Sequence, residues 1–208
     1  RQQQKRKLPE SYSYYHFAQM EEALAGADLL VGGVSSFGVE WFCGAVLKHI
    51  PAGLPVLTVT KGMLDDAEGN LQVYPEVFER GAGSRGLLLN AVGGPCTSYE
   101  LADGDQTEVT FCGRDMALLR QLRQLFETDC YHVSLSTDVV GVEAAVALKN
   151  AYALGVAMTI GLVNRNLGEN AGLHYNSQAG AFYQATKEML KLLKMQGADQ
   201  DSAVIGIG

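Results

Sequence analysis

The chain has little positive charge: 16 lysines and arginines face 23 aspartates and glutamates, which gives a formal net charge of −7. General nucleic-acid binding depends on basic patches that displace counterions, so this balance argues against a nucleic-acid partner. The basic cluster from Arg1 to Lys7 lies at a chain end, where a solvated tail is the expected interpretation. Hydrophobic residues make up 47% and charged residues 19%, a composition that predicts a packed globular core.

Cysteines are few and no two of them have C-x-x-C spacing. Cys43, Cys96, Cys112 and Cys130 lie among apolar residues. The pattern favours buried free thiols over a metal site or a disulfide framework, and free thiols suit a reducing cytoplasm. No N-terminal signal peptide is visible. We therefore expect a cytoplasmic protein without a bound metal.

One long apolar run is present, from Val139 to Val163. Its length approaches that of a membrane span, but Glu143, Lys149 and Asn150 interrupt it. Charged groups are costly inside a bilayer. We expect a buried central helix and no membrane span.

The first two thirds of the chain alternate between strand-like and helix-like segments. Continuous apolar runs without strict alternation are typical of parallel strands covered on both faces. The expected strands cover 29–34, 54–62 and 85–95, and the expected helices between them cover 39–50 and 73–81. Two further strands, 107–112 and 131–136, flank a helix over 114–127. This order predicts an α/β unit with a Rossmann-like parallel sheet.

The pattern changes near residue 135. Residues 138–163 and 178–197 both have the spacing of long helices. We therefore predict two partial domains: an α/β dinucleotide-binding domain over residues 1–134, and the start of an all-α domain over residues 135–208.

Gly81, Gly83 and Gly86 have the spacing G-x-G-x-x-G. A phosphate-binding loop of this kind must follow a strand and open a helix, because the helix N-terminus binds the pyrophosphate. Here a predicted helix precedes the glycines and a predicted strand follows them. We interpret the string as a turn, with Gly81 ending the helix.

Two lysines occupy positions where a ligand is expected. Lys61 follows a buried strand in TVTKG, at the carboxyl end, where open α/β sheets bind ligands. Lys149 lies midway along the most apolar helix, where loss of solvation lowers a lysine pKa and favours a proton acceptor. The alternative is that Lys149 extends to the surface or pairs with Glu143. The turn at Gly94, a residue without a side chain, places accessible backbone atoms beside the carboxyl edge of the predicted sheet.

These segments together resemble one family. The segments that carry the resemblance are TVTKG, GGPCTSYELADGDQT, VGVEAAVALKNAYALGVAMTIGL and NLGENA. Their order and separations resemble those of NAD(P)-dependent glycerol-3-phosphate dehydrogenases. The resemblance covers most of residues 8–208. It implies a Rossmann-like sheet domain followed by a helical domain, NAD or NADP as cofactor, interconversion of glycerol 3-phosphate and dihydroxyacetone phosphate, and a homodimer.

The resemblance also implies residue roles. Lys149 corresponds to the catalytic lysine that accepts the proton of the C2 hydroxyl, and Lys61 to the lysine that touches both cofactor and substrate. The implied substrate-binding residues are Lys61, Gly94, Cys96, Lys149 and Asn150. The implied cofactor-binding residues are Ser35, Phe37, Lys61 and Ser98.

The chain departs from the family pattern at several places. Gly93 stands where serine is usual, Cys96 where serine or threonine is common, and residues 172–183 replace an alanine-rich stretch, which allows a shifted substrate preference. The family's opening glycine loop and its later arginine-asparagine phosphate grip are not among these residues. We therefore expect a piece of a longer enzyme with little activity alone. The alternatives are a related reductase for another small hydroxy or keto acid, and a non-catalytic binding module.

Overall fold

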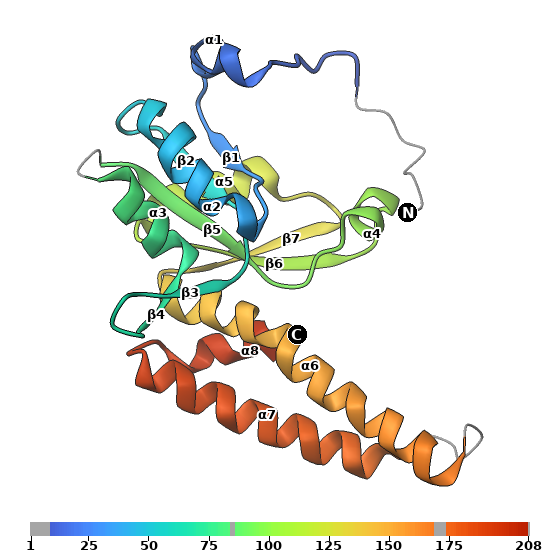
Figure 1. The fold of residues 1–208 in the computed structure, drawn as a ribbon. Coiled ribbons are helices and arrows are strands. Elements are labelled where there is room, and N and C mark those ends of the chain that lie inside the picture. The colour runs from blue at the N-terminus through green and yellow to red at the C-terminus, as the bar shows by residue number, and fades with distance from the viewer. Residues whose placement is uncertain (1–8, 84–85, 169–173, 208) are drawn as a thin grey trace.

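The computed structural model describes residues 9–83, 86–168 and 174–207. Its centre is a five-stranded sheet with helices on both faces, and a pair of long helices extends beyond the sheet (Figure 1). In the order β1-β2-β5-β6-β7 the strands are β1 (Leu30–Gly32), β2 (Pro55–Thr58), β5 (Leu88–Gly93), β6 (Thr107–Gly113) and β7 (Tyr131–Ser136). The observed sheet confirms the Rossmann-like α/β class.

The sheet is mixed rather than wholly parallel. β1, β2 and β5 are mutually parallel, and so are β6 and β7, but β5 and β6 run antiparallel, with Ala91 opposite Cys112. The helix α4 (Ser98–Asp103) between them lies at the end of the sheet (Figure 1). The chain therefore turns back beside β5 instead of crossing a face, as a parallel connection requires. The expectation of a parallel sheet was wrong at this pair.

Helices cover both faces of the sheet. The helical elements in the first part of the chain are η1 (Phe17–Gln19), α1 (Met20–Leu24), η2 (Ser36–Gly38), α2 (Val39–Trp41), η3 (Phe42–Val46), η4 (Leu47–His49) and α3 (Tyr74–Ala82). The later ones are α5 (Met116–Phe126), α6 (Val139–Leu167), α7 (Tyr175–Met195), η5 (Gln200–Ser202) and α8 (Ala203–Ile207). One core joins the segment 39–50 and α3 to Val56 and Leu89, and another joins α5 to Leu57 and Phe111. Alternate residues of β2 thus serve opposite cores, as the two-residue period of a strand requires.

The glycine string connects a helix to a strand, as predicted. Gly81, however, does not end the helix: α3 runs to Ala82, and Gly83 follows it with φ +62°. A Cβ at Gly81 would lie 2.7 Å from the Cys43 Sγ. Gly81 therefore permits close packing of α3 against the segment 42–46, while Gly83 makes the turn.

A small hairpin separates β2 from α3 and was not expected from the sequence. It consists of β3 (Met63–Asp65) and β4 (Leu71–Val73), paired antiparallel. Asp66 accepts hydrogen bonds from the backbone N–H of Glu68 and of Asn70 at the turn. Residues 63–73 alternate too weakly in hydrophobicity to predict the two strands. Asp66 and Asn70, which are typical turn residues, were the signal from which the hairpin could have been predicted.

The long helix α6 is buried only over its first part. Residues from Gly141 to Val146 are buried, whereas Leu154 and Met158 are 64% and 61% exposed. Among the described residues, α6 is the one helix long and apolar enough to cross a membrane by length and composition, a criterion that core helices of soluble proteins also meet. The expectation of a fully buried helix was therefore wrong for the C-terminal half of α6, which α7 covers along one side (Figure 1).

All four cysteines are free thiols, as expected, but they are not all buried. Cys112 is buried on β6, Cys43 and Cys130 are half-buried, and Cys96 is exposed. Cys96 differs because it follows the β5 turn and lines an open pocket rather than a core. No cluster of three or more His, Cys, Asp or Glu side chains that could hold a metal ion occurs in the described ranges.

Gly93 lies where β5 packs tightly against α6. A Cβ there would lie 2.5 Å from Val142 Cγ1 and 3.1 Å from Val146 Cγ2. We expect Gly93→Ser to lower the free energy of unfolding by about 1–3 kcal/mol through overpacking. Urea denaturation of the full-length gene product measures this loss. In the Val142→Ala background the same substitution should cost less; equal costs in the two backgrounds would contradict the proposed clash.

Candidate active site

A pocket of about 420 Å³ lies where the carboxyl ends of β2 and β5 meet α6. Its lining residues are Lys61, Gly62, Gly94, Pro95, Cys96, Thr97, Val146, Ala147, Lys149 and Asn150. Because β2 and β5 are parallel neighbours, residues that follow them are brought to the same edge of the sheet. The structure thus brings together the predicted residues Lys61, Gly94, Cys96, Lys149 and Asn150, and we call this pocket the lysine pocket.

Lys61 is held by the backbone of the neighbouring strand's turn. Its Nζ donates a hydrogen bond to the carbonyl oxygen of Gly94, at 2.7 Å. Gly94 has φ +117°, and a Cβ there would lie 3.1 Å from the Cα of Val109. A side chain at position 94 would therefore strain the turn and push it from β6, so that glycine is needed to keep the carbonyl facing Lys61.

The loop that carries Lys61 is fixed on its other side by an aromatic ring. Gly62 has φ +140°, and a Cβ there would meet the Tyr74 ring at 2.7 Å. Tyr74 is buried and packs against Phe78 of α3. Tyr74 thus limits the position of the lysine loop, a role that no local sequence pattern shows.

Lys149 reaches the pocket from α6. It is half-buried, and loss of solvation together with the positive charge of Lys61 lowers its pKa from 10.5. Loss of solvation disfavours the ammonium form, and a nearby like charge disfavours it further. A larger fraction of Lys149 is consequently neutral near physiological pH than in an exposed lysine, which is what a proton acceptor needs.

Glu143 lies six residues before Lys149 on α6 and is 1% exposed. Burial raises the pKa of its carboxyl to about 8, while the charge of Lys61 acts in the opposite direction. Neither carboxyl oxygen has a hydrogen-bond partner, so the alternative pairing of Lys149 with Glu143 is not made through a hydrogen bond. No role in the site is expected for Glu143 from the sequence, although a carboxyl group within an apolar run is the signal that could have indicated one.

Three predicted cofactor residues lie outside the lining of the lysine pocket. Ser35 precedes η2, Phe37 lies within it, and Ser98 begins α4 directly after the pocket residue Thr97. Phe37 is 99% exposed, with its ring open to solvent at the same edge of the sheet as Lys61. These three residues therefore lie outside the lining of the lysine pocket, with Ser98 directly beside it in the chain.

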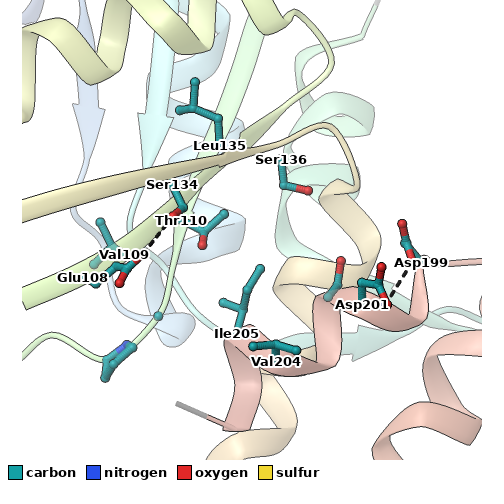
Figure 2. A pocket seen from close by; sticks show the side chains of 13 residues that line it. Glu108, Val109, Thr110, Ser134, Leu135, Ser136, Asp199, Asp201, Val204 and Ile205 are labelled. Atoms are coloured by element: carbon teal, nitrogen blue, oxygen red, sulfur yellow. Dashed lines mark hydrogen bonds between the residues drawn. The ribbon is translucent and has the colours of Figure 1, made fainter.

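A second pocket, of about 480 Å³, shares Gly94 and Pro95 with the lysine pocket but opens toward β6, β7 and η5 (Figure 2). Its charged side chains are Glu108, Asp199 and Asp201. Glu108 accepts a hydrogen bond from Ser134, and Asp199 caps η5 through the backbone N–H of Asp201 (Figure 2). These carboxylates repel an anionic ligand, whereas the two lysines attract one, so we assign the candidate active site to the lysine pocket.

The fold and the pocket define a class: a Rossmann-like mixed sheet joined to a helical region, with two lysines at the carboxyl edge of the sheet. Sequence comparison gives the family. Residues 3–119 match the N-terminal part of NAD-dependent glycerol-3-phosphate dehydrogenase, and residues 138–208 match its C-terminal part. The chain belongs to the NAD-dependent glycerol-3-phosphate dehydrogenase family, which confirms the resemblance found in the sequence.

Individual relatives agree with this assignment. The chain is 31% identical over 193 residues to the glycerol-3-phosphate dehydrogenase [NAD(P)+] of Symbiobacterium thermophilum, covering 93% of this chain and 52% of that protein. It is 29% identical over 185 residues to the NADP(+)-dependent glycerol-3-phosphate dehydrogenase of Archaeoglobus fulgidus, covering 89% and 53%. The chain thus spans about half the length of these curated relatives.

Solved structures share the fold. The DsGPDH structure of Dunaliella salina superimposes with a TM-score of 0.76 at 24% identity, over 91% of this chain and 31% of that one. The glycerol-3-phosphate dehydrogenase of Coxiella burnetii gives a TM-score of 0.73 at 20% identity, over 90% and 53%. At these identities the likeness establishes the fold alone.

Proposed function

We propose that these residues form part of an oxidoreductase that interconverts glycerol 3-phosphate and dihydroxyacetone phosphate with NAD or NADP. One observation carries the proposal: Lys61 and Lys149 line a single pocket at the carboxyl edge of the sheet, and the pKa of Lys149 is lowered there. The family membership and the names of the relatives support the same reaction.

In the oxidative direction, neutral Lys149 accepts the proton of the substrate's C2 hydroxyl through its Nζ. A nicotinamide cofactor, held by residues such as Ser35, Phe37 and Ser98, would supply the hydride-accepting chemistry at the same carbon. Lys61, fixed on the Gly94 carbonyl, supplies positive charge that stabilises the alkoxide character developing on the oxygen. In the reverse direction, the Lys149 ammonium returns its proton to the carbonyl oxygen as the alcohol forms.

The remaining pocket residues orient the substrate in this proposal. Asn150, next to Lys149, offers an amide donor to the substrate's oxygens, and Gly94 and Cys96 shape the wall opposite α6. Ser35, Phe37 and Ser98 are proposed to contact the cofactor from the same edge of the sheet. An exposed aromatic ring such as that of Phe37 offers a surface on which a planar cofactor ring can stack.

We further propose a cytoplasmic homodimer built from a dinucleotide-binding domain over residues 1–134 and a helical domain from residue 135 onward. Free thiols in all four cysteines support the reducing compartment. The packing of α6 against β5, α7 and α8 supports a role in the helical domain rather than in a membrane.

The test is a spectrophotometric assay of the full-length gene product with dihydroxyacetone phosphate and either NADH or NADPH. We expect turnover with the phosphorylated triose. Ketopantoate and 6-phosphogluconate, each assayed with the cofactor in the oxidation state that its reaction needs, stand for the related reductases, and we expect little turnover with either. Turnover of an alternative substrate but not of the triose would replace the proposed substrate. Absence of any turnover, together with no thermal stabilisation by either cofactor, would favour a non-catalytic module.

A further inference from the structure

Gly93 is the last residue of β5, and its surroundings leave no room for a side chain. A Cβ there would lie 2.5 Å from Val142 Cγ1 and 3.1 Å from Val146 Cγ2, both on α6, and 3.8 Å from Ile205 Cγ2 on α8. Gly93 is not among the glycines with positive φ, so its backbone conformation does not require glycine. The close approach of α6 is therefore the reason that position 93 has no side chain.

The face of α6 that meets Gly93 also carries the proposed base. Val142, Val146 and Lys149 are separated by four and three residues, and such residues lie on one face of a helix. Val146 and Lys149 both line the lysine pocket. At 1.5 Å per residue, Lys149 lies about 10 Å further along the helix axis than Val142. The depth at which α6 packs on Gly93 therefore sets the depth at which Lys149 enters the pocket.

The strand β5 holds the other lysine of the pocket. Gly94 directly follows Gly93, and its carbonyl oxygen accepts the hydrogen bond from Lys61 Nζ at 2.7 Å. Lys61 is thus attached to the end of β5, whereas Lys149 belongs to α6. The spacing between β5 and α6 consequently determines the spacing between the two lysines.

A side chain at position 93 would have to move α6. Val142 is 0% exposed and Val146 is 5% exposed. A valine in a helix has one strongly preferred χ1 rotamer, and a close-packed interior leaves its methyl groups little free space. Carbon atoms in favourable contact lie about 3.5 Å or more apart, whereas the Cβ would lie 2.5 Å from Val142. The helix would therefore have to move away from β5 by about 1 Å.

We propose that Gly93 is a positioning residue for the lysine pair: because it has no side chain, α6 lies close against β5, and this closeness sets the distance of Lys149 from Lys61. The inference rests on the proposed function. In the proposed reaction Lys149 Nζ must reach the proton of the C2 hydroxyl while the substrate also contacts Lys61. A misplacement of about 1 Å at a reacting group can cost about 10²-fold in rate.

Gly93→Ala tests this role, because it adds a single methyl group. In the full-length gene product we expect kcat for glycerol 3-phosphate oxidation to fall by about 10–100-fold. KM for the nicotinamide cofactor should change little, since the proposed cofactor residues Ser35, Phe37 and Ser98 do not lie on α6. The double variant Gly93→Ala/Val142→Ala removes the methyl groups that meet the new Cβ, and it should recover most of the lost kcat.

Gly155→Ala is the matched control, because it makes the same change on α6 at a point where a Cβ would meet nothing within 4 Å. Its kcat should equal that of the wild type. A wild-type kcat in a folded Gly93→Ala protein would overturn the inference, and so would an equal loss in the control. A double variant no more active than Gly93→Ala would show that the loss arises at the Gly94 turn and not from α6.

Crystal structures of the full-length gene product give a readout that does not depend on activity. In Gly93→Ala we expect α6 to lie about 1 Å further from β5 than in the wild type, and in the double variant we expect it to return. An unmoved α6 in Gly93→Ala would overturn the inference whatever the kinetics. If glycerol 3-phosphate proves not to be a substrate, a displaced α6 still shows that Gly93 sets the place of Lys149.

Val142→Ile is the second variant, for the case that Gly93→Ala does not fold. It enlarges the same contact from the side of α6 and leaves the β5 turn unchanged. We expect a smaller displacement of α6 in the same direction and a smaller loss of kcat. A wild-type kcat together with an unmoved α6 in Val142→Ile would overturn the inference.

Discussion

Replacing Lys149 by methionine is expected to lower kcat for glycerol 3-phosphate oxidation by about 10²–10⁴-fold in the full-length gene product, the usual loss when a general base is removed. Methionine keeps an unbranched apolar stem in the pocket but has no group that accepts a proton. Lys149→Arg should lose a comparable factor although it keeps the positive charge, because a guanidinium does not deprotonate in proteins. Steady-state kinetics at several pH values measures both losses.

The pH dependence provides a sharper test of the same residue. The lowered pKa of Lys149 means that the oxidation rate should rise with pH and level off below 10.5, the ordinary value for a lysine. In Lys149→Met the residual rate should lose that dependence. Lys191→Met, at an exposed position on α7, is the control and should keep the wild-type rate. Near-normal turnover by a folded Lys149→Met protein would remove Lys149 from the proposed role.

The second large effect is on stability and comes from Glu143. Its pKa is 4.5 when the chain is unfolded and about 8 in the folded protein, which corresponds to roughly 4–5 kcal/mol of free energy. The folded state retains a proton that the unfolded state releases above pH 4.5. The contribution of the neutral carboxyl to the free energy of unfolding is therefore fully present below pH 4.5. It declines as the pH rises and is lost once the pH passes about 8.

The difference between wild type and Glu143→Gln isolates this contribution. Urea denaturation at a series of pH values should give a wild-type free energy of unfolding that falls, relative to that of the variant, between the two pKa values. Other titrating groups affect both proteins equally and cancel in the difference. The buried amide adds an offset that does not vary with pH. Two parallel curves would show that Glu143 has an ordinary pKa in the folded protein.

Much of the sheet domain could be predicted from the sequence. The apolar runs around Val56 and Leu89 predicted strands because both faces of these strands are covered by helices. The order of helix and strand around Gly83 excluded a phosphate loop, since only one order presents a helix N-terminus to the pyrophosphate. The position of Lys61 after a strand and that of Lys149 within an apolar helix predicted that both face a ligand, and both line one pocket in the structure.

Other features could not be predicted because they depend on contacts between distant residues. Gly81 has the spacing of a helix stop, but its contact with Cys43, 38 positions earlier, gives it a packing role. The antiparallel pairing of β5 with β6 follows from where α4 lies, which no periodicity records. The exposure of Leu154 and Met158 depends on which elements cover α6, and an apolar pattern does not show which neighbours are present.

The family, the α/β class and the choice of Lys61 and Lys149 as site candidates could all be inferred from the sequence, because periodicity, chain order and residue type are local properties of the chain. The hydrogen bond from Lys61 to the Gly94 carbonyl, and the place of Lys149 in the same pocket, became visible only in the folded chain. It alone showed that Glu143 lies buried without a hydrogen bond within electrostatic reach of Lys61. Desolvation and Coulomb interactions depend on distances between residues that are remote in sequence, so the pKa shifts that make this pocket a candidate for proton transfer arise only when the chain folds.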